Sequence, residues 1–319
     1  MNEPLPDNVV ISTINWNSEN HTIKLIDSLL SANLENCKVV ICDNGSSDSS
    51  YKNLKSHLLK MDWISQKKIE VESDQIESIQ HLFGKNGVEF ILLKLFENYG
   101  FAKANNIAYR YVDNFAVFEY FWILNNDTTI TTSSMSELIS NSKKNHNNII
   151  LSSLIYDADD VQKIWFSGGV YNKYLAKSKH VSYTKFKISK YQYLSGCSMF
   201  VPVQVISKIG LLNENYLIYG EDIEYSMRAT KNKIPLGIVE SSIVFHVGGG
   251  SVIKRSYYAY HLYVRNTVSV IIKGHTRFFL LSIIPYHLSK VVYLFLFKSV
   301  PFSSLKGYII GFFDAIFKR

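Results

Sequence analysis

The side chains best suited to chemistry stand where apolar runs end in carboxylates and amides. An aromatic and branched run from Phe118 to Leu124 stops at Asn125, Asn126 and Asp127. A carboxylate at the end of a buried strand is costly unless a cation or several hydrogen-bond donors meet it. Asp127 is therefore a candidate ligand for a metal ion that carries a polyphosphate. The other interpretation is an N-cap for the helix predicted over 133–139.

Asp43 shows the same pattern at an earlier strand. The apolar segment Lys38 to Cys42 ends at Asp43, and a polar turn follows at once. A turn or a helix cap explains Asn44, Gly45 and Ser46 without any ligand. Two acidic strand ends on the same edge of a sheet nevertheless favour a shared ligand site.

A glycine turn precedes the next predicted helix. Asn98 and Gly100 form this turn, and Asn105 lies in the first helical turns. The N-terminus of a helix can receive phosphate or sugar oxygens. These three residues are therefore candidates for binding a phosphate or a sugar.

Two further positions combine glycine with an aromatic or apolar setting. Trp165 precedes Gly168 and Gly169 in a predicted turn, where an exposed ring either stacks on a sugar or packs within its own loop. Gly196 falls inside the strand predicted over Tyr193 to Pro202. A glycine there indicates either close approach by a ligand or a bulge.

An acidic cluster opens the helix that is predicted to run to about Lys231. Glu221, Asp222 and Glu224 follow Tyr219 and Gly220, and the helix dipole stabilises carboxylates in a first turn. An adjacent Glu–Asp pair also suits a general base for a hydroxyl nucleophile.

His246 is the remaining candidate. It follows the strand predicted over Leu236 to Phe245 and precedes the glycines 248–250. A histidine at this place is either structural or a metal ligand.

The elements that must position these groups alternate between strand and helix. The segment Val9 to Ile14 predicts a first strand, and Ile23, Ile26 and Leu29 recur with helical spacing after it. Further strands are predicted over Val88 to Leu95 and over 149–155, and residues 51–87 are interpreted as a helix plus a variable excursion. This order predicts an α/β domain, whose strand ends converge on one edge.

Composition favours a packed core and anionic partners. The 319 residues are 47% hydrophobic and carry a net charge of +7. Phosphates or acidic lipid headgroups are the expected partners, and no nucleic acid is expected because no nucleic-acid motif accompanies the charge. The basic excess lies late in the chain, at Lys254, Arg255, Arg265, Lys273, Arg277, Lys290, Lys298, Lys306, Lys318 and Arg319.

Cysteine usage and the N-terminus predict the compartment. Cys37, Cys42 and Cys197 form neither a metal-type pair nor a secreted framework, so buried thiols in a reducing compartment are expected. The N-terminus lacks a basic region followed by a long apolar stretch, so no cleaved signal is expected. The catalytic domain is predicted to face the cytoplasm.

A helical, aromatic and basic segment is predicted to follow the catalytic domain, with boundaries 1–255 and 256–319. Phe278 to Phe297 is nearly long enough to span a bilayer, but Pro285, His287 and Lys290 interrupt it. Helices that lie in the membrane interface are the favoured interpretation. Packing on the catalytic domain or on a second subunit in a homodimer, and spanning, are the alternatives.

Taken in order, these motifs resemble the family 2 inverting glycosyltransferases, particularly the bacterial rhamnosyltransferase-like branch. The resemblance covers about residues 9–266. The residues that carry it are Asn15, the Asp43-Asn44-Gly45-Ser46-Ser47-Asp48 turn, Asn98-x-Gly100-Phe101-Ala102 with Asn105-Asn106, Leu124-Asn125-Asn126-Asp127, Gly196 with Met199, Tyr219-Gly220-Glu221-Asp222-x-Glu224, His246, Tyr257-Tyr258 and Arg265-Asn266.

The resemblance implies a GT-A fold, a nucleotide-sugar donor and a divalent metal, Mn²⁺ or Mg²⁺. Asp127 matches the last residue of the family's Asp-x-Asp motif, and Asn125 replaces the first, which leaves one carboxylate unless His246 or the diphosphate supplies further ligands. Asp43 is implied to recognise the pyrimidine base. The other implied donor residues are Thr13, Asn15, Asn98, Gly100, Asn105, Asn126 and Arg265.

The implied reaction is inverting transfer of a sugar to an acceptor hydroxyl. Asp222 is expected to be the general base, with Glu221 as the near alternative, and Trp165, Gly196 and Tyr219 are expected to contact the acceptor. Rhamnose on deoxythymidine diphosphate is the leading donor, and a lipid-linked glycan of a bacterial surface polysaccharide is the expected acceptor. The alternatives are a sugar-nucleotide pyrophosphorylase and a non-catalytic, membrane-bound glycan-binding protein.

Overall fold

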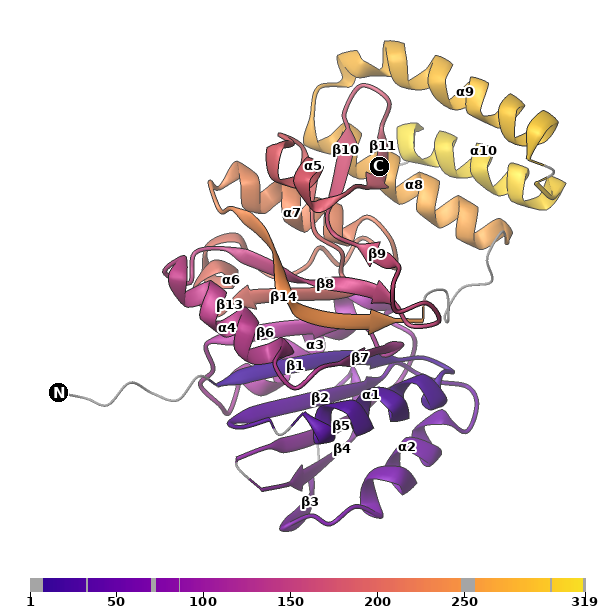
Figure 1. The fold of residues 1–319 in the computed structure, drawn as a ribbon. Coiled ribbons are helices and arrows are strands. Elements are labelled where there is room, and N and C mark those ends of the chain that lie inside the picture. Colours follow the sequence, from indigo (N-terminus) through magenta and orange to yellow (C-terminus); the bar gives the residue numbers. More distant parts are fainter. Residues whose placement is uncertain are drawn as a thin grey trace.

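The computed structural model describes residues 8–32, 34–69, 73–85, 87–247, 256–298 and 300–317. The predicted glycines 248–250 with Ser251, and the basic residues Lys254, Arg255, Lys318 and Arg319, lie outside the described residues. The described chain forms a large mixed sheet with helices on both faces, a small second sheet and a C-terminal helical segment (Figure 1). The α/β prediction is confirmed.

The parallel half of the large sheet holds the predicted early strands. Its parallel strands follow the spatial order β5, β2, β1, β6, and the mostly buried side chains of these strands explain their near-continuous apolar runs. Their bounds are β1 Val9–Asn15, β2 Cys37–Asp43, β5 Glu89–Leu95 and β6 Tyr120–Leu124.

The other half of the sheet brings the later motifs beside this core. Strand β13 (Ser198–Pro202) pairs antiparallel with both β6 and β8 (Ile150–Asp157). Strand β14 (Leu236–His246) then runs parallel to β8, and the short β7 (Thr128–Ile130) closes this edge against β14. The chain therefore crosses from β6 to the far edge through residues 125–127.

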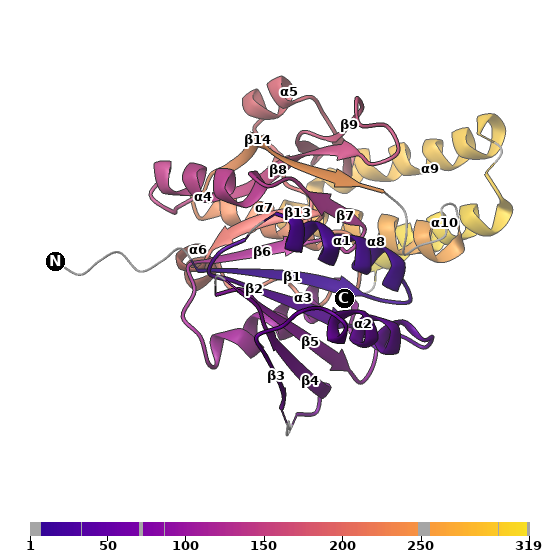
Figure 2. The ribbon, with the colours of Figure 1, turned by 60° about the horizontal axis from the view of Figure 1, so that its bottom comes forward.

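Helices cover both faces of the sheet. Helices α1 (Glu19–Ser31) and α2 (Ser50–Leu59) pack together on one face, and α3 (Gly100–Asp113) lies on the other (Figure 2). The remaining helices of this part are α4 Ser134–Lys144, α5 Tyr183–Ile188, α6 Val203–Ile209 and α7 Glu221–Lys231. The start of α7 agrees with the predicted acidic helix.

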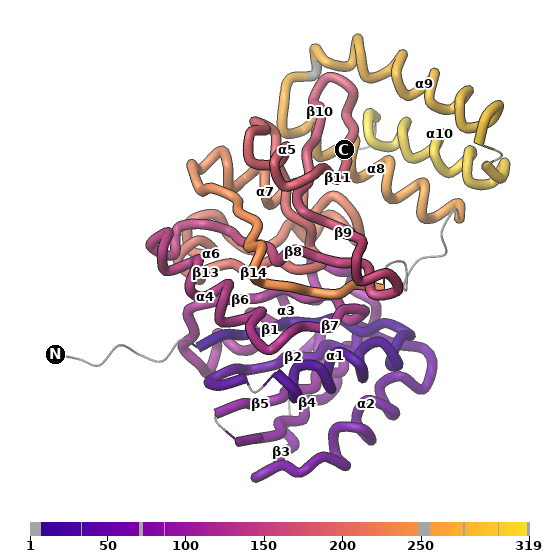
Figure 3. The backbone as a smooth tube through the Cα atoms, viewed as in Figure 1, coloured from indigo at the N-terminus to yellow at the C-terminus, as the bar shows by residue number. Residues whose placement is uncertain are grey.

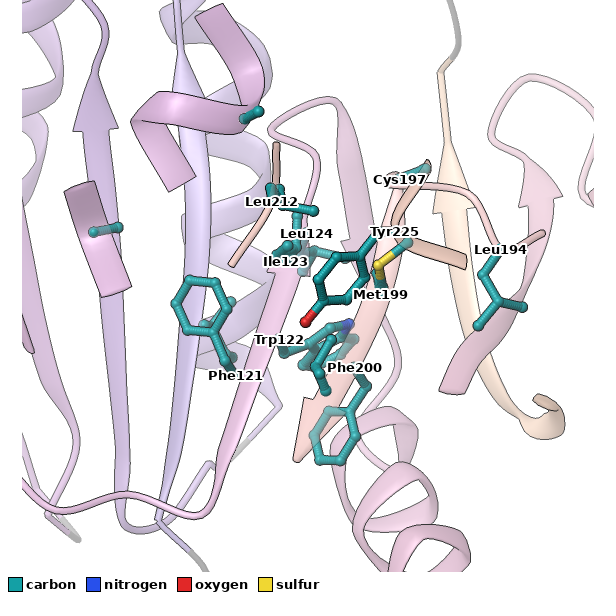
Figure 4. Packing of buried hydrophobic residues seen from close by; sticks show 14 of the residues in the cluster. Phe121, Trp122, Ile123, Leu124, Leu194, Cys197, Met199, Phe200, Leu212 and Tyr225 are labelled. Carbon is teal, nitrogen blue, oxygen red and sulfur yellow. The ribbon is translucent and has the colours of Figure 1, made fainter. Parts of the chain in front are cut away.

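Large buried side chains meet where β6 lies beside β13. The rings of Tyr120 and Phe200 stack with their centroids 4.9 Å apart, and the indole of Trp122 donates to the Ser198 hydroxyl at 3.0 Å. Figure 4 shows the apolar side chains of both strands packed against Leu212 and Tyr225. The loops that leave these two strands are thus held on a rigid base.

The interpretation of residues 51–87 was incomplete, because an antiparallel hairpin follows α2. Strands β3 (Ser65–Ile69) and β4 (Ile76–Phe83) extend the sheet beyond β5. Ile76, Ile79 and Leu82 are three residues apart, a spacing typical of a helix. They lie on a strand all the same, and the register of β4 shifts between Ile76 and Ser78. A bulge changes which side chains face the core, so the expected alternation is lost.

The strand predicted over 193–202 was also wrong in part. The structure has β12 (Gln192–Tyr193), a loop over 194–197, and then β13. Strand β12 belongs to a small sheet with β10 (Gly169–Asn172) and β11 (Lys177–His180), and β9 (Ile164–Phe166) pairs with β8. Gly196 therefore lies in a loop between the two sheets and not inside a strand.

The C-terminal segment packs onto the domain through α8 (Tyr257–Gly274). Helix α10 (Phe302–Phe317) lies along α8, and a Cβ at Gly307 or Gly311 would lie 2.3 or 2.4 Å from carbonyl oxygens of α8. The glycines therefore let the two backbones approach closely. A short 3₁₀ helix (Arg277–Phe279) leads into α9 (Leu280–Phe297), which lies beside α10 (Figure 3). Among the described residues, α9 alone is long and apolar enough to cross a membrane.

Candidate active site

Asp127 and His246 meet at the edge of the large sheet. Thr128 pairs with His246 in the β7–β14 ladder, and the Val247 amide donates to the Asp127 carbonyl at 3.0 Å. This pairing places the His246 Nε2 atom 3.2 Å from the Asp127 Oδ1 atom. Both residues are buried, with 8% of Asp127 and 5% of His246 exposed.

The Asp127 carboxylate is ionised although it is buried. Burial raises its pKa, but the contact with His246, the charge of that imidazole and the charge of His21 outweigh burial, and the pKa lies below its usual value. Ionised Asp127 is thus available to a cation at neutral pH.

Two polar atoms of this pair lack hydrogen bonds. Within the described part of the chain, Asp127 Oδ1 and His246 Nδ1 are buried without a hydrogen-bond partner. A carboxylate oxygen and an imidazole nitrogen are suitable ligands for Mn²⁺ or Mg²⁺. No group of three or more His, Cys, Asp or Glu side chains that could hold a metal occurs among the described residues. Asp127 Oδ1 faces His246 Nε2, whereas Nδ1 lies on the other side of the imidazole ring. A divalent cation held by both residues would therefore replace the direct contact between Oδ1 and Nε2 and would need further ligands.

Trp165 lies beside this pair and is not the exposed aromatic that was predicted. Its ring centroid is 4.2 Å from that of His246 and 5.1 Å from that of His180. The side chain is half-buried on β9, because this strand pairs with β8 next to β14. Trp165 therefore forms one side of the Asp127 site.

The loop over residues 194–197 joins the metal candidate to the base candidate. The Asn125 amide donates to the Cys197 carbonyl at 3.0 Å. One residue earlier, the Gly196 amide donates to Asp222 Oδ2 at 3.4 Å. A Cβ at Gly196 would lie 3.1 Å from the Phe101 ring of α3, so glycine lets this loop pass close to α3. Asp127 and Asp222, far apart in sequence, thus lie on either side of one short loop.

The two neighbouring carboxyls of α7 differ in their hydrogen bonds. Backbone amides of Ile223 and Gly196 donate to Asp222, at 2.7 and 3.4 Å. Glu221 Oε2 is buried and has no partner in the described part of the chain. Burial raises the pKa of Asp222 to about 6, whereas burial and the Asp222 charge raise that of Glu221 well above its usual value. Asp222 is therefore the carboxyl of the pair that ionises more readily, because backbone amides donate to it.

The turn before α7 is held by α8. Tyr219 and Gly220 have φ angles of +65° and +91°, and the Asn266 side chain donates to the Ile218 carbonyl at 2.7 Å. The Tyr219 ring packs edge-on against Tyr263, with the centroids 5.8 Å apart. Arg265 also lies on α8, where its charge lowers the pKa of the Tyr216 phenol that burial raises. Arg265 therefore lies near Tyr216, in the loop before α7. Among the described residues, no hydrogen bond or salt bridge joins Arg265 to Asp127.

Asp43 and Asn15 form a closed network at the ends of β1 and β2. The Asn15 amide donates to Asp43 Oδ1 at 2.8 Å, and the Ser46 hydroxyl donates to the same oxygen at 2.7 Å. Both Asp43 and Asn15 are 0% exposed, and burial raises the pKa of Asp43. In this arrangement the Asp43 side chain has no exposed surface that a pyrimidine nucleobase could contact. Thr13 is buried nearby on β1, and its hydroxyl has no partner in the described part of the chain.

Asn105 is a core residue and does not line an open pocket. It is 0% exposed, accepts from the Ser12 hydroxyl at 2.7 Å and donates to the Phe101 carbonyl at 2.9 Å. These bonds fix α3 to β1. Its position in the first helical turns was predicted correctly, but its burial could not be read from the motif.

The N-terminus of α3 is occupied by protein groups. Asn98 Oδ1 accepts from the Gly100 amide at 2.9 Å, and the Leu217 carbonyl accepts from the Phe101 amide at 2.7 Å. A Cβ at Gly100, which has φ +78°, would lie 2.4 Å from the Leu217 oxygen. Packing against the loop before α7 therefore explains this glycine, and these amides do not face a phosphate.

Asn126 links the early residues to Asp127. Its amide donates to the Thr22 hydroxyl at 2.9 Å, and that hydroxyl donates to Asn15 Oδ1 at 2.8 Å. Thr22 and His21 on α1 were not predicted as part of the site. Helical periodicity gives no signal for them, because their role depends on α1 packing beside β7.

No protein-family model and no curated protein matches this chain. Solved structures do match. The chain aligns with TarS 1-349 from S. aureus at 14% identity and a TM-score of 0.55, over 97% of this chain and 81% of that one. It aligns with GalNAc-T7, solved with UDP, GalNAc and Mn²⁺, at 13% identity and a TM-score of 0.62, over 98% of this chain and 56% of that one.

A third match is the mannosyltransferase PcManGT from Pyrobaculum calidifontis, solved with GDP-Man and Mn²⁺. The identity is 11% and the TM-score 0.56, over 98% of this chain and 88% of that one. The chain has the GT-A fold. The fold prediction is confirmed by these glycosyltransferase structures, and the identities are too low to select a branch, a sugar or an acceptor.

Proposed function

We propose that this chain is a metal-dependent, inverting glycosyltransferase that uses a nucleoside-diphosphate sugar. The observation that carries the proposal is the placement of the buried Asp127–His246 pair across the 194–197 loop from Asp222. This placement supports a single displacement, in which Asp127 and His246 would face the leaving diphosphate and Asp222 would be the base for the nucleophile. The GT-A fold of the matching structures supports this proposal.

Asp127 and His246 would hold Mn²⁺ or Mg²⁺, which when bound neutralises the charge of the departing diphosphate. Asp222 accepts the proton of the acceptor hydroxyl, and the hydroxyl oxygen attacks the anomeric carbon. The new C–O bond forms on the face opposite the breaking bond to the diphosphate, so the anomeric configuration inverts. The half-buried Trp165 keeps water away from Asp127 and presents a ring on which a sugar can stack.

Asp43, Asn15 and Thr13 support the donor end. The hydrogen bonds of Asp43 with Asn15 and Ser46 hold the 44–48 turn. To recognise a pyrimidine base, Asp43 must first lose its hydrogen bond from the Ser46 hydroxyl. Asn126 then transmits the position of this network to Asp127 through Thr22.

The finer proposal is transfer of rhamnose from a deoxythymidine-diphosphate donor to a lipid-linked glycan at the inner face of a bacterial membrane. The apolar α9 and the late basic residues support the membrane part. Treating residues 1–255 as the catalytic domain and 256–319 as the membrane-facing segment belongs to the same proposal.

The test is a panel of nucleotide sugars incubated with the purified chain, with Mn²⁺ or with a chelator. We expect nucleoside diphosphate to be released from one donor class only when the metal is present. Release without any metal would remove the role of Asp127 and His246. A pyrophosphorylase would instead form nucleoside triphosphate from the sugar nucleotide and added diphosphate. A glycan-binding protein would release nothing while retaining glycan.

A further inference from the structure

A second cavity lies in the small sheet. It has a volume of about 390 Å³ and is formed by β10, the turn to β11 and residues 189–191. None of the residues proposed for the active site lines it. We call it the lysine pocket, and the lining residues that define it are Tyr171, Lys173, Lys177, Lys179, Lys190 and Tyr191.

The lysine pocket carries positive charge without a nearby balance. No acidic residue lines it, and the sequence from residue 161 to residue 213 contains lysines but no Asp or Glu. In the described part of the chain, no carboxylate forms a salt bridge with any of its four lysines. A concave site with several ammonium groups and phenols suits a phosphate group.

Three of these lysines lie over aromatic rings; the Lys190 ammonium is 5.9 Å from the centroid of the Tyr191 ring. The Lys173 ammonium lies 5.0 Å from the centroid of the Phe279 ring and 5.1 Å from that of Tyr191. The Lys177 ammonium lies 4.8 Å from the centroid of the Tyr286 ring on α9. These contacts keep the positive charge at the mouth of the pocket next to α9.

The turn that forms the pocket is attached to α9. The Ser282 hydroxyl donates to the Tyr174 carbonyl at 2.6 Å, and His287 Nε2 lies 3.0 Å from the Leu175 carbonyl oxygen. The β10–β11 hairpin and the first half of α9 lie side by side (Figures 1 and 3). The lysine pocket and α9 therefore move as one unit.

The outer face of α9 is apolar and uncovered. Five of its exposed apolar residues recur at spacings of three and four, which places these five along one side of the helix. These residues are Leu281 (73% exposed), Ile284 (37%), Leu288 (52%), Val292 (55%) and Phe295 (62%). An apolar helix face beside basic side chains is the arrangement of an interfacial helix.

We propose that the lysine pocket binds the phosphate of an anionic membrane lipid while the outer face of α9 enters the acyl boundary beside it. The proposal deepens the membrane association put forward under the proposed function and does not depend on glycosyl transfer. The pocket fixes which side of the small sheet faces the membrane, and the attached loop 194–197 then sets the active site at a constant orientation to it.

The experiment is flotation of the full chain with phosphatidylglycerol vesicles. The test variant is Lys179→Gln with Lys190→Gln, since both side chains line the pocket and are exposed, so folding is unaffected. The matched control is Lys185→Gln with Lys187→Gln on α5, which removes the same charge from exposed positions that do not line the pocket. We expect the pocket variant to bind about 30-fold more weakly, about 1 kcal/mol for each lysine, and the control to change by less than about threefold. If both variants lost the same amount of vesicle binding, the binding would depend on diffuse surface charge, and the proposed role of the lysine pocket would be wrong.

Competition with inorganic diphosphate distinguishes a pocket that binds a lipid phosphate from one that binds a soluble phosphate. Millimolar inorganic diphosphate is expected to release the wild-type chain from the vesicles. If diphosphate, without added metal, binds to the wild-type chain but not to the Lys179→Gln, Lys190→Gln variant, and the vesicles do not bind, the pocket takes a soluble phosphate and the lipid assignment is wrong. A stable dimer without vesicles, lost when Leu288→Ser is introduced, would show that a second copy covers α9 and would also overturn the proposal.

Membrane binding through the lysine pocket and glycosyl transfer are tested by independent measurements. Release of nucleoside diphosphate from a donor is measured without vesicles, where the pocket variant is expected to match the wild type. A chain that floats through the lysine pocket but cleaves no donor would leave the inference standing and remove the proposed function.

Discussion

Glu221 and Asp222 are adjacent in sequence, but their surroundings raise their pKa values to different extents. Two backbone amides donate to Asp222, whereas Glu221 is buried with an unpaired oxygen. A general base must be ionised before the reaction, and a protonated carboxyl cannot accept a proton. This difference makes Asp222 the better candidate for the proposed base.

Substitution of each carboxyl by its amide tests this assignment. Asp222→Asn is expected to lower kcat roughly 10²-fold or more, because the base is lost while the shape is kept. Glu221→Gln is the matched control, and we expect it to keep kcat within about fivefold because a neutral amide replaces a neutral acid. Initial rates of nucleoside diphosphate release measure both. A larger loss for Glu221→Gln would exchange the two roles.

The pH profile follows from the raised pKa of Asp222, which is about 6. Because the ionised form is the active one, kcat should fall as the pH drops through this pKa, tenfold for each further pH unit, and should level off above it. Rates measured at constant ionic strength across this range give the result. A kcat that is independent of pH between about 5 and 7 would contradict the assignment.

At the scale of elements, close packing explains the glycines better than ligand contact does. Gly100 and Gly210 share the same φ of +78°, but only Gly100 meets backbone, the Leu217 carbonyl oxygen. The nearest atom to a Cβ at Gly210 is Arg228 Nη1, at 3.4 Å. A comparison of substitutions at the two glycines therefore distinguishes the cost of backbone strain from the cost of a steric clash.

Gly100→Ala is expected to destabilise the fold by about 3 kcal/mol, since strain and a clash with Leu217 act together. Gly210→Ala should cost about 1 kcal/mol, from strain alone. Chemical denaturation of both variants gives the free energies of unfolding. Equal costs would mean that the loop before α7 does not press on α3.

Sequence patterns predicted the parallel strands and the acidic start of α7, because near-continuous apolar runs and a first-turn acidic cluster are local signals. The β3–β4 hairpin was missed because a bulge between Ile76 and Ser78 disguises the alternation. The motif residues Asp43 and Asn105 were located correctly along the chain. Their complete burial depends on packing between β1, β2 and α3, which no local pattern encodes.

At the scale of the whole molecule, the active site and the apolar helix α9 lie on one packed body. Helix α8 holds the turn before α7 through Asn266 and also packs against α10 through Gly307 and Gly311. Packing of the C-terminal segment on the catalytic domain was one of the predicted alternatives, and α8 supports the Asp222 turn in this way. Membrane contact and catalysis can therefore share one rigid frame.

Membrane association itself is tested on the outer face of α9. Leu288→Ser with Phe295→Ser is expected to weaken binding to vesicles at least about tenfold, because two exposed apolar side chains leave the acyl boundary. The matched control is Ile64→Ser with Val117→Ser, two exposed apolar residues outside the C-terminal segment. Vesicle sedimentation compares the pairs. Unchanged binding of the α9 variant would show that charge alone holds the protein to the membrane.

The most direct measurement for the central claim is the thermal stability of the chain with nucleotide sugars, in the presence and absence of Mn²⁺. At a donor concentration about 100 times Kd, we expect the melting temperature to rise by about 5 °C only when Mn²⁺ is present. Asp127→Asn should abolish this rise, and Asp62→Asn, an exposed control, should keep it. A donor that stabilises the chain equally without Mn²⁺, or equally in the Asp127→Asn variant, would contradict the account.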